Sequence, residues 1–172
     1  MNCIAHRGSA NRVPENSMAG IRDTAAQRIK QIECDISVAS DRVAVIFHNE
    51  SQRRMTGDPR SVLSLTSSEL IQIPLMIHHI CPTRYIPIAQ NWMLVVADHK
   101  LFRHVEIKVH DQAVQRVVDA TLDAFDRAGL RPLQVRVYSF SFEVIHLIRR
   151  YRPELDFGIA TIRLADVPLD AP

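Results

Sequence analysis

The sequence CIAHRGSANRVPEN, from Cys3 to Asn16, decides how the rest of the chain is interpreted. It opens with an apolar run that is too short for a helix and is typical of a buried strand. His6, Arg7 and Gly8 follow directly, and a glycine at this point lets the backbone turn tightly. An imidazole and a fixed cation therefore stand at a strand end, where α/β enzymes place their chemistry. On its own, the tripeptide fits an ordinary turn equally well.

A second strand is predicted at 31–39, where apolar and polar residues alternate. Because successive side chains of a strand point to opposite faces, Glu33 and Asp35 share one face. An amphipathic edge strand with its carboxylates in water would show the same alternation. A later strand, HVEIKV, repeats the pattern and places Glu106 and Lys108 on one face.

The run VAVIF at 43–47 has no polar residue and leads straight into His48. A continuous apolar run of this length predicts a strand that is buried on both faces. Two buried strands therefore end in histidine, at His6 and at His48. Two histidines at equivalent strand ends are harder to explain as solvated turn residues than one.

Helices are predicted between the strands from apolar residues spaced 3.6 apart and from capping residues. Thr66 to Glu69 forms a capping box that opens a short helix, and Asp111 and Ser141 are expected to cap later helices. Alternating strands and helices predict parallel strands joined by right-handed crossovers. The predicted strands are 3–5, 31–39, 43–47, 104–109, 133–138 and 157–162, and the longer helices are 16–30, 88–100, 111–128 and 141–152.

Parallel strands would bring all of these strand ends to one rim, the edge where a β/α barrel gathers its functional groups. Three carboxylates at one edge repel one another unless a cation lies between them, and three oxygen ligands suit Mg²⁺ or Ca²⁺. Basic side chains there would hold an anionic substrate, and two imidazoles could serve as general acid and base. This combination favours phosphoryl-transfer chemistry. The candidate residues are Glu33, Asp35 and Glu106 for the metal, Arg7 and Lys108 for the anion, and His6 and His48 for proton transfer.

Composition adds limits on the class of protein. The 172 residues suggest a single domain, and a net charge of +2 with no basic block gives no reason to expect nucleic acid as a partner. The three cysteines are expected to be buried, reduced thiols. No signal peptide is visible, and the apolar stretch at 71–97 is too interrupted to cross a bilayer. A cytoplasmic location is therefore expected.

At this point the motifs resemble those of glycerophosphodiester phosphodiesterases, over about residues 3 to 160. They are HRG (6–8), PEN (14–16), the ExD pair (33, 35), Asp41 followed by His48, the loop Arg54 to Gly57, EIK (106–108) and SF (139–140). The resemblance implies a TIM-type (β/α)₈ barrel that hydrolyses glycerophosphodiesters to glycerol 3-phosphate and an alcohol. It implies Mg²⁺ or Ca²⁺ on Glu33, Asp35 and Glu106, with His6 and His48 as the acid/base pair. It also implies that Arg7 and Lys108 contact phosphate and that Glu15 lies at the metal or substrate.

Two departures from the family pattern stand out. Asn49 follows His48 where the family has aspartate, and 172 residues are fewer than the 200 to 250 or so of a complete barrel. The expectation is therefore a barrel domain over 1–172 that ends after about six strand-helix units, with a loose tail at 163–172. An unclosed barrel exposes strand edges and could self-associate through them. A catalytically inactive remnant or interaction module, and a sphingomyelinase D-like phosphodiesterase, remain alternatives.

Overall fold

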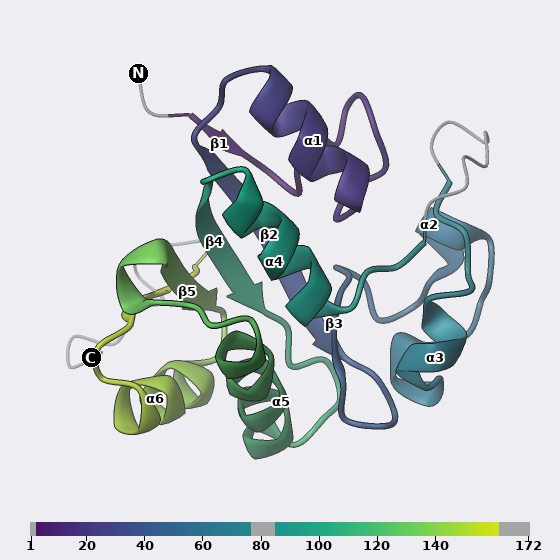
Figure 1. Cartoon of the computed structure of the whole chain (residues 1–172). Helices are drawn as coiled ribbons and strands as arrows, with labels where there is room; N and C mark the ends of the chain where they lie inside the picture. Colours follow the sequence, from purple (N-terminus) through teal and green to yellow (C-terminus); the bar gives the residue numbers. More distant parts are fainter. Residues whose placement is uncertain (1–2, 77–84, 162–172) are drawn as a thin grey trace.

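The computed structural model describes residues 3–76 and 85–161, which contain a six-stranded sheet (Figure 1). Five of the strands are parallel, and their spatial order β1-β2-β4-β5-β6 follows their order in the chain. A sheet wound in one direction like this is typical of a β/α barrel, because a doubly wound sheet reverses its strand order at a switch point. The strands are β1 (Ile4–Ala5), β2 (Gln31–Val38), β4 (Phe102–Ile107), β5 (Val135–Ser139) and β6 (Asp156–Ile159).

The remaining strand, β3 (Ala44–Ile46), is antiparallel to β2, so the expectation that all strands run parallel is wrong. Only a short turn separates the two strands, with Arg42 in the left-handed region at φ 66°, whereas a parallel crossover needs a dozen or more residues. The hairpin turns the chain back along β2, and the Phe47 amide donates to the Asp35 carbonyl at 3.0 Å. This reversal returns His48 to the part of the sheet that carries Asp35.

Four longer helices lie over one face of the sheet (Figure 1). They are α1 (Met18–Ala26), α4 (Ala89–Asp98), α5 (Val114–Arg127) and α6 (Phe142–Tyr151). Shorter elements occupy the connections: α2 (Arg53–Thr56), α3 (Ser67–Leu70) and the 3₁₀ turns η1 (Val62–Ser64) and η2 (Pro132–Gln134). No helix in the described ranges is long and apolar enough to cross a membrane.

Capping residues account for three of the six α-helix starts in the described residues. The capping box at Thr66 to Glu69 is present as predicted, and the Ser141 hydroxyl accepts from the Val144 amide. Ser17 caps α1 by accepting from the Gly20 amide. The prediction that Asp111 caps a helix is wrong, because α5 starts after Ala113 without a side-chain cap.

Two boundaries matter for the site. Strand β4 begins and ends two residues earlier than predicted, so Lys108 follows the last strand residue instead of lying inside the strand. Helix α1 ends at Ala26 instead of Lys30, because Arg28 takes a left-handed conformation at φ 59°.

The tail predicted at 163–172 lies outside the described residues.

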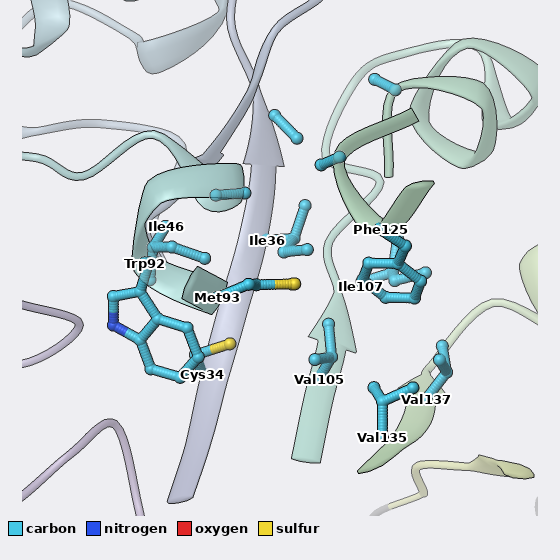
Figure 2. Packing of buried hydrophobic residues seen from close by; sticks show 14 of the residues in the cluster. Cys34, Ile36, Ile46, Trp92, Met93, Val105, Ile107, Phe125, Val135 and Val137 are labelled. Atoms are coloured by element: carbon cyan, nitrogen blue, oxygen red, sulfur yellow. The ribbon is translucent and has the colours of Figure 1, made fainter. Parts of the chain in front are cut away.

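The main hydrophobic core lies between the helices and the sheet (Figure 2). Every second residue of β2, β4 and β5 packs there against Trp92 and Met93 of α4 and Phe125 of α5. The intervening residues must point to the opposite face, which carries Glu33, Asp35 and Glu106. Arg103 of β4 is an exception on the helix side, where it is buried and donates to the Met93 carbonyl at 3.1 Å. Cys34 is part of this core, as expected, but Cys3 is exposed; both are free thiols, and Cys81 lies outside the described residues.

A second, smaller core explains why β3 has no polar residue. Val45 and Phe47 pack into this cluster, while Ala44 and Ile46 face the main core. The strand is therefore buried on both faces, as its sequence predicted. The partners of Val45 and Phe47 come largely from the segment that follows, and they are Ala39, Met55, Val62, Leu65, Leu70, Leu75 and Ile86.

Candidate functional site

Three carboxylates converge where the helix-free face of the sheet meets the carboxyl ends of the strands. Glu33 and Asp35 project from β2, and Glu106 projects from β4, where it pairs directly with Asp35. Each side chain offers one oxygen, and these oxygens lie within 4.8 Å of one another. The alternation in both strands, which predicted shared faces, therefore brings the three predicted metal ligands together, and they could hold a metal ion.

The electrostatics of this cluster favour a bound cation. Burial, together with the charges of Asp35 and Glu106, raises the pKa of Glu33 to about 8, although the Arg7 amide donates to Glu33 Oε2 at 2.8 Å. Asp35 Oδ1 is buried, and within the described residues it makes no hydrogen bond beyond its ion pair with Lys108. Three carboxylates this close together form a donor set that suits a hard divalent ion such as Mg²⁺ or Ca²⁺.

Two cations flank the carboxylates on opposite sides of Asp35. Arg7 Nε lies 3.2 Å from Asp35 Oδ2, and Lys108 Nζ lies 3.2 Å from Asp35 Oδ1 and also pairs with Glu106. Asp35 is fully buried, so these pairs are shielded from solvent screening. The predicted anion-binding residues Arg7 and Lys108 are thus both present beside the carboxylate cluster.

Glu15 forms ion pairs with two arginines, Arg7 and Arg54. Its carboxylate accepts from Arg54 Nη1 at 2.9 Å and from Arg7 Nη1 at 3.3 Å. Burial acts to raise the pKa of Glu15, but the hydrogen bonds and charges of Arg54 and Arg7 outweigh it and lower that pKa. Glu15 therefore holds Arg7 in place. Sequence reasoning quoted Arg54 only as part of a motif and missed this contact, which joins residues 39 positions apart.

The two predicted acid/base histidines have different surroundings. The His6 side chain is 71% exposed, with Nε2 at 3.9 Å from Glu33 Oε2. His48 is half-buried, and its Nδ1 is enclosed without a hydrogen-bond partner among the described residues. Burial lowers the pKa of His48, and the charges of Lys108 and Arg7 lower it further against an opposing effect of Asp35. His48 is therefore neutral at pH 7.

Asn16 is a site residue that sequence reasoning missed, since it was considered only as a helix start and as the last residue of the PEN motif. It is buried, its side chain donates to Asp35 Oδ2 at 2.9 Å, and it accepts from the Asp35 amide at 3.2 Å. Its backbone is left-handed at φ 55°, a conformation that asparagine tolerates better than most residues. The amide clamps Asp35 in position, and the PEN motif was the signal that could have identified it.

A cavity of about 300 Å³ opens beside the carboxylate cluster. Glu106 and Lys108 form one side, and His110, Phe140 and Ser141 form much of the rest. Lys108 Nζ lies 5.7 Å from the centre of the Phe140 ring, which places a cation over an aromatic face. The cavity could accept the organic part of a substrate whose anionic group lies at Arg7 and Lys108.

Comparison with known proteins agrees with this geometry. The model of the glycerophosphoryl diester phosphodiesterase family matches residues 6–168. The chain belongs to this family. Among its relatives in the phosphodiesterase family, the glycerophosphodiester phosphodiesterase 1 of Homo sapiens is 28% identical over 154 residues, covering 87% of this chain and 46% of the relative. The chain thus spans about half the length of the curated relatives it matches.

Solved structures of phosphodiesterases share the fold. A phosphodiesterase from Oleispira antarctica, in complex with the product sn-glycerol-3-phosphate, has a TM-score of 0.85 at 23% identity, covering 94% of this chain and 67% of that one. A glycerophosphodiester phosphodiesterase from Agrobacterium tumefaciens has a TM-score of 0.78 at 20% identity, covering 90% and 64%. The predicted α/β barrel fold is confirmed, with the described strands forming an open sheet.

Proposed function

We propose that this chain carries the site for metal-dependent hydrolysis of glycerophosphodiesters to glycerol 3-phosphate and an alcohol. The observation that supports it most directly is the group of three carboxylates flanked by Arg7 and Lys108 at the mouth of a cavity. Family membership supports the same reaction class. So does the structural neighbour from Oleispira antarctica, which holds sn-glycerol-3-phosphate as its product.

Glu33, Asp35 and Glu106 would hold Mg²⁺ or Ca²⁺, and the ion would supply positive charge that stabilises the developing negative charge on the phosphate oxygens. Arg7 and Lys108 bind the non-bridging oxygens of the phosphodiester, where the guanidinium can donate two hydrogen bonds at once. Glu15 and Arg54 keep Arg7 oriented, and Asn16 keeps Asp35 oriented. These contacts set the geometry before substrate arrives.

Proton transfer is divided between the two histidines. His48 is neutral because of its burial, so it takes a proton from the attacking water molecule as the new P–O bond forms. His6 gives a proton to the oxygen of the departing alcohol as the other P–O bond breaks. His6 is exposed, so the alcohol can leave directly to solvent. The cytoplasmic location, the single domain and the self-association expected from the sequence stay predictions.

The test is hydrolysis of glycerophosphocholine by the purified chain in Mg²⁺, Ca²⁺ or EDTA, with glycerol 3-phosphate and choline both measured. Glycerol 3-phosphate released with either metal and lost in EDTA supports the proposal. Choline released from sphingomyelin but not from glycerophosphocholine would favour the sphingomyelinase D-like alternative.

A folded chain that releases nothing under any of these conditions would contradict the proposal and favour an inactive module. Circular dichroism establishes folding independently of activity. Isothermal titration calorimetry with Mg²⁺ or Ca²⁺ then tells whether the carboxylate cluster binds metal even where turnover is absent.

A further inference from the structure

His110 is a third histidine beside the site, and neither the sequence motifs nor the proposed mechanism uses it. His110 lies in the connection just after β4, and its backbone is left-handed at φ 49°. It lines the cavity together with Lys108 and Phe140. Its Nε2 lies 2.9 Å from the hydroxyl of Ser37, which is fully buried on β2. The Ser37 hydroxyl also donates to the Phe47 carbonyl at 2.8 Å.

These two hydrogen bonds determine which ring nitrogen of His110 carries the proton. A serine hydroxyl has a single hydrogen, and a carbonyl oxygen can only accept. The Ser37 proton is therefore used on Phe47, so Ser37 Oγ must accept from His110, and Nε2 must carry the proton. In the neutral ring, Nδ1 then holds a free lone pair.

The free nitrogen is available to a ligand. Nδ1 makes no hydrogen bond within the described residues, and unlike Nδ1 of His48 it is not among their buried nitrogens that lack a partner. Burial lowers the pKa of His110, with the charge of Lys108 adding to this effect and those of Glu50 and Asp35 opposing it. The ring is therefore neutral at pH 7, and it lines a cavity that also contains the Lys108 cation and the Phe140 ring.

The other polar groups of the cavity leave this role open. The Ser139 hydroxyl donates to the Ile107 carbonyl and accepts from the Ser141 amide, and the Ser141 hydroxyl accepts from the Val144 amide, so each hydroxyl oxygen already accepts one hydrogen bond. Lys108 can only donate, and Glu106 is paired with it. A hydroxyl group entering the cavity therefore meets an unused acceptor at His110 Nδ1.

We propose that His110 is a substrate-binding residue, which accepts at Nδ1 a hydrogen bond from a hydroxyl of the glycerol moiety and so selects polyol phosphates over alkyl phosphates. The inference rests on the proposed function, since it assumes that a glycerol phosphate group occupies the site. A single hydrogen bond of this kind changes affinity about tenfold. A site built to pair a hydroxyl also rejects ligands that lack one.

The test compares binding of sn-glycerol 3-phosphate and propyl phosphate by calorimetry in the presence of Mg²⁺. The wild-type chain should bind glycerol 3-phosphate about tenfold more tightly, and His110→Phe should remove that preference while leaving the affinity for propyl phosphate unchanged. Equal preference in the wild type and the variant would overturn the role of His110 but leave the proposed function standing. If the wild type binds neither phosphate, the proposed function fails, and this inference fails with it.

A second measurement does not depend on a variant that must keep a left-handed backbone at position 110. Nitrogen-15 NMR of the histidine rings should show the His110 proton on Nε2, and the Nδ1 resonance should shift on addition of glycerol 3-phosphate but not of propyl phosphate. A proton found on Nδ1, or an Nδ1 resonance that ignores both ligands, would overturn the proposal.

Discussion

The antiparallel pairing of β3 with β2 places His48, which follows β3, at the site. The Phe47 amide donates to the Asp35 carbonyl, and Nδ1 of the neighbouring His48 ring is enclosed without a partner among the residues that the structure describes. Unpaired buried nitrogens are costly, so a native site that contains one is expected to use it. Asn49, which replaces the family's aspartate, instead accepts from Arg54 Nε at 3.0 Å and so helps to hold the arginine that binds Glu15.

Replacing His48 by alanine should lower turnover of glycerophosphocholine by about 10²–10⁴-fold, the usual contribution of a general acid or base. Metal affinity should stay near the wild-type value, because the three carboxylates remain. Steady-state kinetics and metal calorimetry measure the two effects separately. His146→Ala is the matched control, since His146 is exposed on α6, and it should keep full activity. Survival of activity in the His48 variant would remove His48 from proton transfer.

The Asn16 clamp on Asp35 yields a second prediction at this scale. Asn16→Ala removes a donor and an acceptor from a fully buried carboxylate residue and should lower the free energy of unfolding by about 1–3 kcal/mol. Metal affinity should fall too, because Asp35 is no longer oriented. Urea denaturation and calorimetry measure both quantities.

Asn16→Gly separates the side chain from the backbone in this experiment. Glycine adopts φ 55° without strain, whereas alanine adds about 1 kcal/mol at a left-handed position. Both variants should lose metal affinity equally if the clamp orients Asp35. Wild-type affinity in the glycine variant would show that the clamp serves stability only.

Elements in this chain were predictable where a local pattern determines them. The alternation in β2 and β4 placed Glu33, Asp35 and Glu106 on shared faces without knowledge of the fold, and the capping box located α3. The direction of β3 was missed because a short connection, and not the strand's own pattern, determines it. Contacts such as Arg54 with Glu15 join distant segments, and no local pattern encodes them.

Helix α1 packs closely against the HRG turn at 6–8, and the closest approach is between Gly20 and Gly8. A Cβ on Gly20 would lie 2.4 Å from the Gly8 carbonyl oxygen, and backbone cannot move aside as a side-chain end can. Gly20→Ala should therefore cost at least the 1–3 kcal/mol or so of ordinary overpacking and displace Arg7 from Asp35. Urea denaturation measures the first effect, and phosphate-ester binding measures the second.

Gly129→Ala is the comparison for this prediction. Gly129 has φ 62° but open space around it, so alanine there adds only backbone strain of about 1–2 kcal/mol and should leave ligand binding unchanged. If Gly20→Ala is as stable and as active as Gly129→Ala, the close approach of α1 to the HRG turn is not a constraint on the site.

At the scale of the whole molecule, the two faces of the sheet have different roles, one in the hydrophobic core and the other in the candidate site. One face of the sheet is covered by helices and carries the core, and the other face carries the charged residues. The alternation of strands and helices predicted the parallel α/β sheet, whereas the barrel was implied by the family resemblance. Three carboxylates this close together repel one another, so a cation bound between them should stabilise the fold.

Metal and pH should therefore act together on the stability of the chain. The pKa of Glu33 is raised from 4.5 to about 8, so between these values the folded chain holds a proton that the unfolded chain lacks. Without metal, the free energy of unfolding should fall as pH rises through this range. A metal ion needs the ionised carboxylate, so its affinity should rise about tenfold per pH unit below pH 8 and then level off.

The measurement is thermal unfolding at pH 6, 7 and 8, with Mg²⁺ or with EDTA. The stabilisation by Mg²⁺ should be largest at pH 8, since a ligand that binds only the folded state raises the melting temperature in proportion to the logarithm of its affinity. Glu33→Gln cannot exchange a proton at this position, so in that variant the stabilisation should be small and nearly independent of pH. If Mg²⁺ stabilises the wild-type chain equally at pH 6 and pH 8, the metal does not displace a proton from Glu33. The metal would then bind at another site.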